Sequence, residues 1–100
     1  MSKRIRASTG NVFLDLGFAP GEAENLRVRS DLLIRLGEVI KTRRLTQAAA
    51  AKLLGVSQPR VSDLMRGKID RFSVDSLVEM LGRIGMRVDF TTTRRRARVA

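Results

Sequence analysis

The chain lacks cysteine, histidine, tyrosine and tryptophan, and it contains only two prolines. Without cysteine it can form neither disulfides nor thiolate metal sites, so a reducing cytoplasm is the expected location. Without histidine it lacks the commonest general base and the commonest metal ligand. Its ten acidic residues are scattered without ligand-like spacing. We therefore expect no catalytic residues, no metal site, no cofactor and no enzymatic activity.

Long hydrophobic runs are also missing, because no apolar stretch approaches the roughly 20 residues that a membrane span needs. The basic start "MSKRIR" is followed by "ASTGNVFLDLGFA", in which Gly10, Asn11 and Asp15 interrupt any apolar run. We therefore expect neither an export signal nor a membrane partner. A length of 100 residues suits one small globular domain.

Positive charge is abundant, with 20 Lys and Arg against 10 Asp and Glu. Seven of these cations lie in terminal segments without acids, namely Lys3, Arg4, Arg6, Arg94, Arg95, Arg96 and Arg98. Such tails are either solvated or lie on phosphates, where they add salt-sensitive affinity for nucleic acid. Nucleic acid is the expected partner.

Apolar spacing predicts a mainly helical chain after a short N-terminal arm at 1–19, which we expect to be partly ordered or disordered. From Pro20 the apolar residues recur every three or four positions, which predicts a helix at about 21–43 with a possible break near Arg29–Ser30. Thr46 is an N-cap candidate for the next helix, "TQAAAAKLL", and Gly55 can end it.

The segment "GVSQPRVSDLMR" predicts a turn followed by a further helix. Ser57 is its N-cap candidate, and Pro59 is tolerated in a first turn because amides there have no intrahelical partner. We expect this helix to end at Gly67, with Val61, Leu64 and Met65 facing the core. Two helices joined by a short turn form either a helical hairpin or a helix-turn-helix. Small Ala51 and the position of Gly55 favour the near-perpendicular crossing of a helix-turn-helix.

The remaining sequence predicts one more helix and a strand. A helix capped by Ser73 and ended by Gly85 follows, with Val74, Leu77, Val78, Met80 or Leu81, and Ile84 facing inward. "MRVDFT" then alternates apolar and polar residues with the period of a strand. The expected fold is thus mainly all-α, a lambda-repressor-like helix-turn-helix bundle of four to five helices with a C-terminal β-strand. The domain spans 20–91, and a basic tail covers 92–100.

"LTQAAAAKLLGVSQPRVSDLMRGK" resembles the helix-turn-helix of the lambda-repressor/Cro-like proteins, the XRE family, and the similarity covers about 33–84. The flanks "NVFLDLGFAPGEAENLRVRSDLLIRL" and "KIDRFSVDSLVEMLGRIGMRVDF" are similar to HigA-type antitoxins. That resemblance implies an operon-autoregulating repressor that binds a palindromic operator as a homodimer and neutralises a RelE/HigB-like toxin. An XRE-type regulator without a toxin partner is the alternative.

Five residues of the second helix are candidate base readers: Gln58, Pro59, Arg60, Ser62 and Asp63. The amide of Gln58 can donate and accept at once, which matches N6 and N7 of adenine, although it can also be simply solvated. Pro59 contacts a thymine methyl or only starts the helix, and Arg60 reaches guanine or a phosphate. Asp63 accepts from a cytosine amine or pairs with Arg60 or Arg66.

Phosphate contacts are expected from Gln47, Ser57, Arg66 and Lys68. Gln47 resembles the phosphate-contacting glutamine of the family, at a helix N-terminus that favours an anion. Charged helix ends such as Arg66 and Lys68 are otherwise solvated.

Dimerisation is expected through the C-terminal strand, because a lone strand leaves its backbone groups unpaired. Pairing with a second copy would bury Met86, Val88 and Phe90 and would set two half-sites about 34 Å apart. The alternatives are that 86–90 pairs with 11–16 of the same chain or frays.

Overall fold

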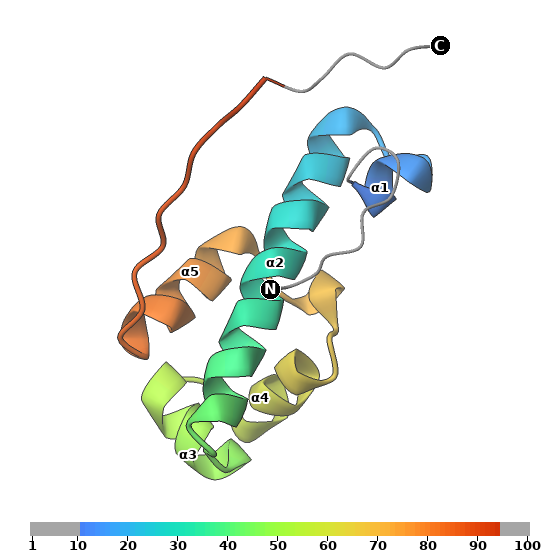
Figure 1. Cartoon of the computed structure of the whole chain (residues 1–100). Helices are drawn as coiled ribbons and strands as arrows, with labels where there is room; N and C mark the ends of the chain where they lie inside the picture. Colours follow the sequence, from blue (N-terminus) through green and yellow to red (C-terminus); the bar gives the residue numbers. More distant parts are fainter. Residues whose placement is uncertain (1–10, 95–100) are drawn as a thin grey trace.

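The computed structural model describes residues 11–94, which form five α-helices and one 3-10 helix (Figure 1). The basic segments at 1–10 and 95–100 lie outside the described residues. The elements are α1 (Val12–Asp15), α2 (Pro20–Thr42), α3 (Gln47–Leu54), α4 (Gln58–Met65), η1 (Ile69–Arg71) and α5 (Val74–Arg83).

The long helix α2 connects the two ends of the molecule, with α1 at its N-terminal end and α3 and α4 at its C-terminal end (Figure 1). Pro20 occupies its first turn, where no intrahelical N–H bond is lost. The break expected near Arg29–Ser30 is wrong, because α2 runs through this position without interruption. The Arg29 guanidinium donates to Asn25 Oδ1 one turn earlier at 2.6 Å, which adds a side-chain contact along the helix.

One buried asparagine, Asn11, joins residues 11–18 to the rest of the fold. Asn11 Oδ1 accepts from the backbone N–H of Phe13 at 2.9 Å and so caps α1. Asn11 Nδ2 donates to the Ala23 carbonyl at 3.3 Å, which attaches this cap to α2. Phe13 and Phe18 meet edge to face, with ring centroids 6.2 Å apart. The part of the N-terminal arm from Asn11 is therefore a short helix docked on α2.

The hydrophobic core lies between α2 and the three helices that follow it. Its fully buried large side chains come from four helices and are Leu36, Leu54, Val61, Leu64, Leu77 and Leu81. The predicted inward positions of α4 and α5 are confirmed at Val61, Leu64, Leu77 and Ile84. Val78 was expected inside but is 39% exposed, because α5 packs through Leu77 and Leu81 on α2.

After α5 the chain continues as an extended segment, 86–94, and its first residues, 86–89, line a groove with α2 and α5 (Figure 1). Met86 and Val88 are half-buried and pack on the core, whereas Phe90 is 86% exposed. Within residues 11–94 no β-strand is formed, so the predicted strand is not confirmed in the single chain. The alternative pairing with 11–16 is wrong, because those residues form α1 and its caps.

Within the same described range, no helix combines the length and the apolarity needed to cross a membrane.

Candidate nucleic-acid interface

The turn between α3 and α4 has the geometry that its sequence predicts. Thr46 Oγ1 accepts from Ala49 N–H at 3.0 Å and caps α3. Gly55 ends α3 in the left-handed conformation with φ of 71°, which glycine adopts without a steric penalty. A Cβ at Gly55 would lie 2.7 Å from the Arg83 guanidinium, so α5 covers the turn closely.

Helix α4 begins immediately after this turn. Ser57 Oγ accepts from Arg60 N–H at 3.3 Å, which confirms Ser57 as the N-cap. Ala50 and Ala51 of α3 are buried, and their small side chains let α3 approach the residues Val61 and Leu64 of α4 closely. These contacts hold one side of α4 against the core and leave the other side at the surface.

The candidate base readers separate into two groups. Gln58 and Pro59 are exposed at the N-terminal end of α4, where a recognition helix presents its side chains to a major groove. Ser62, one turn later, is half-buried. Arg60 and Asp63 instead turn toward the chain that follows α4.

Arg60 is held by two contacts within the protein. Its Nη1 donates to the Arg71 carbonyl at 2.7 Å, and its guanidinium carbon lies 4.2 Å from the centre of the Phe72 ring. Asp63 Oδ2 pairs with Arg71 Nη1 at 3.2 Å. Asp63 was expected either to accept from a cytosine amine or to pair with Arg60 or Arg66. In the structure it forms an ion pair, but its partner is Arg71. Arg71 and Phe72 were not predicted from the sequence, since no local spacing links them to α4.

The candidate phosphate contacts lie around α3 and α4. Gln47 and Ser57 are exposed at the N-terminal ends of these two helices, where backbone N–H groups lack intrahelical partners. Arg66 is exposed at the C-cap of α4, and Lys68 is half-buried at the start of η1.

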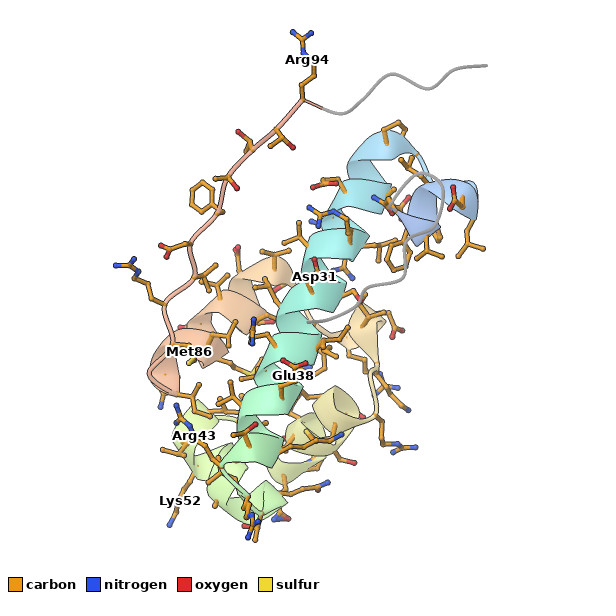
Figure 2. All side chains as sticks on the ribbon, in the orientation of Figure 1. Asp31, Glu38, Arg43, Lys52, Met86 and Arg94 are labelled. Carbon is orange, nitrogen blue, oxygen red and sulfur yellow. The ribbon has the colours of Figure 1, made fainter. Side chains whose placement is uncertain are left out.

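Further cations surround these positions. Arg43 and Arg44, which were not predicted as site residues, are exposed in the connection between α2 and α3. Figure 2 shows Arg43 and Lys52 at the same end of the molecule as α3. In total, residues 41–71 carry eight Lys or Arg and two Asp. This end therefore has the positive charge that a DNA backbone attracts.

Residues 11–94 contain no group of three or more acidic side chains close enough together to hold a metal ion.

Comparison with known proteins places the chain in a family. Residues 12–92 match the model of a family described as "Helix-turn-helix domain". A solved structure, provisionally described as an XRE family transcriptional regulator, is similar, with 38% sequence identity and a TM-score of 0.68. The similarity covers 79% of this chain and 90% of that one. No curated protein matches the chain. The chain belongs to the helix-turn-helix domain family and is an XRE-type DNA-binding transcriptional regulator.

Proposed function

We propose that the protein is a sequence-specific repressor that inserts α4 into the major groove of an operator. The observation that carries this proposal is the exposed N-terminal end of α4 within a basic segment, 41–71, which carries eight Lys or Arg and two Asp. Gln58 reads adenine through a bidentate amide contact, and Pro59 and Ser62 contact neighbouring base edges. Gln47, Ser57, Arg66 and Lys68 bind phosphates and set the register of α4 on the duplex.

Replacing Gln58 with alanine tests this base contact. The variant should bind operator DNA about 1–3 kcal/mol more weakly and lose discrimination at one position in each half-site, since one bidentate contact is removed. Gln47→Ala is the matched control: it removes the same amide from the neighbouring helix and should weaken binding to operator and random DNA alike. Competition binding assays measure both. An equal loss for Gln58→Ala on operator and random DNA would contradict base reading.

We also propose that the operator is palindromic and is bound by a homodimer. One helix-turn-helix contacts few base pairs, so two copies are needed to recognise a long site. Support comes from the extended segment 86–90, which exposes Phe90 beside a groove of about 1120 Å³ lined by α2, Leu81, Met86 and Val88. A second copy of this segment would pair with it and cover Met86, Val88 and Phe90.

Light scattering with the variant Val88→Pro tests this dimer, because proline removes a backbone donor from a strand pair. The wild-type chain should be a dimer at micromolar concentration, and the variant should be largely monomeric with its helical circular dichroism retained. A monomeric wild-type chain, or a fully dimeric variant, would exclude this interface.

An antitoxin role is the more specific form of this proposal: the repressor would neutralise a RelE/HigB-like toxin encoded beside it. The resemblance of the flanks to HigA-type antitoxins supports it. A further observation is that Val12 of α1 and the C-cap residue Leu16 are exposed, Leu16 to 68%, at the opposite end of α2 from α3 and α4. An apolar surface there leaves room for a protein partner while DNA is bound.

Co-expression with the neighbouring small reading frame tests the antitoxin role. The wild-type chain should co-purify with that product and suppress its toxicity, and Leu16→Glu should weaken this complex while leaving DNA binding unchanged. Absence of any complex would favour the alternative, an XRE-type regulator without a toxin partner.

A further inference from the structure

Two polar side chains of α4 are engaged by the segment that follows the helix. Arg60 and Asp63 lie three residues apart, on one face of α4, and both contact Arg71. The Arg71 carbonyl accepts from Arg60 at 2.7 Å, and the Arg71 guanidinium pairs with Asp63 at 3.2 Å. Arg71 thus contacts α4 through both its backbone and its side chain. We call the set of Arg60, Asp63 and Arg71 the α4 brace.

The far side of the α4 brace is attached to the rest of the fold. Phe72, on which the Arg60 guanidinium stacks, belongs to the buried core. Arg29 of α2 donates to the Ile69 carbonyl at 3.3 Å, so η1 is also held by the longest helix. The backbone N–H of Lys68 donates to the Asp63 carbonyl at 3.0 Å. The segment that contacts Arg60 and Asp63 is therefore fixed relative to α2.

We propose that the α4 brace sets the rotation of the recognition helix about its own axis, and that Arg60 and Asp63 are positioning residues and not base readers. This inference rests on the proposed function, in which α4 reads an operator. Val61 and Leu64 hold α4 on one side only, and a helix of two turns held on one side can rotate. A small rotation would move Gln58 out of bidentate geometry with adenine, so a contact on the flank of α4 controls specificity.

The contacts of Arg60 and the charge of Asp63 explain why these residues suit a positioning role better than base reading. For Arg60 to reach a guanine it would have to give up a 2.7 Å hydrogen bond and its stacking on Phe72. A carboxylate on the DNA side of a basic surface is repelled by phosphates unless a cation neutralises it. The Asp63 side chain is only 17% exposed and is paired with Arg71, which removes that repulsion.

Selection of bound duplexes from a pool with randomised sequence tests the proposal and reads out the base preference at each position. The variants are Arg71→Ala, Asp63→Ala and the charge swap that combines Asp63→Arg with Arg71→Asp. In each single variant, discrimination should fall at every position that α4 reads, by about twofold to fivefold, the scale of a partly exposed ion pair. The charge swap should restore the wild-type preferences to within about twofold of their strength.

The control is Arg27→Ala, which removes a carboxylate-paired cation from α2 and should leave the preferences unchanged. Thermal unfolding confirms that each variant is folded at the temperature of the selection. Loss of preference at a single base pair in Asp63→Ala would identify a base reader and overturn the proposal. So would a charge swap without recovery, or single variants that weaken binding while the preferences stay intact. A wild-type chain that selects no sequence would instead overturn the proposed function, and the role of the α4 brace with it.

Discussion

The two ends of the molecule differ in their net charge and in how many of their cations are paired with carboxylates. Residues 11–40 carry five acidic and three basic side chains, whereas 41–71 carry two acidic and eight basic ones. In the first region Arg27 pairs with Glu24 at 2.6 Å and with Asp31 at 3.1 Å. The hydrogen bond from Arg27 to Glu24 raises the pKa of Arg27. In the second region, among the residues that the structure describes, Arg71 is the one cation with a carboxylate partner.

The cations of the first region thus include one paired with carboxylates of its own helix, whereas most cations of the second region have no carboxylate partner among the described residues and can attract a ligand. Surface ion pairs within one helix add a few tenths of a kcal/mol each and attract no partner. Cations without a carboxylate partner keep their attraction for phosphates and add to it collectively. We therefore propose that DNA binds at the end built from α3 and α4, where the cations of 41–71 gather.

Leu36→Ala should have the largest effect, because it removes a fully buried side chain from the core between α2 and the helices that follow it. We expect a loss of about 2–5 kcal/mol in the free energy of unfolding, measured by urea denaturation. Leu53→Ala removes the same atoms from a partly exposed site on α3 and should cost much less. Equal losses in the two variants would mean that the core is not where the structure places it.

Gly55→Ala should destabilise the protein by about 1–2 kcal/mol or more, because an L-residue is strained at its φ of 71°. Gly67 is the matched control, with φ of 72° and no atom within 4 Å of the point where a Cβ would lie. Gly67→Ala should therefore cost only the backbone strain. The difference between the two variants measures the contact with Arg83, and it should shrink when Arg83 is also replaced by alanine.

Ser57→Ala and Ser73→Ala should each cost about 1 kcal/mol, since each removes an N-cap. The two serines cap different helices: Ser57 caps α4, which lies in the basic segment 41–71, and Ser73 caps α5, which lies outside it. Thermal unfolding should show similar losses, but only Ser57→Ala should weaken operator binding. A comparable loss of binding in Ser73→Ala would remove the distinction between the two regions.

The sequence predicts those features whose contacts are local. Each cap, Thr46, Ser57 and Ser73, contacts a backbone group three residues away, so its signal lies within one turn. The alternation in "MRVDF" likewise places Met86, Val88 and Phe90 on one face, of which Met86 and Val88 pack on the core while Phe90 stays exposed. Pairing of that segment is not predictable in the same way, because it depends on a second strand that the described chain does not contain.

Features that depend on distant partners were missed. The docking of α1 on α2 includes a contact between Asn11 and the Ala23 carbonyl, 12 residues away. The contacts of Arg60 and Asp63 cross η1 and join residues separated by 11 and 8 positions. A side chain on the outer face of a helix therefore has the same sequence pattern whether it meets DNA or a neighbouring loop.

The most direct measurement of the central claim is an NMR titration of the protein with its operator duplex, followed through backbone amide shifts. The largest changes should fall within 43–71, including Gln47 and Gln58 at the N-terminal ends of α3 and α4. The amides of α1 should shift little, because that helix lies at the other end of α2. Largest changes in α1, or equal changes at both ends of the molecule, would contradict the assignment of DNA binding to the basic end.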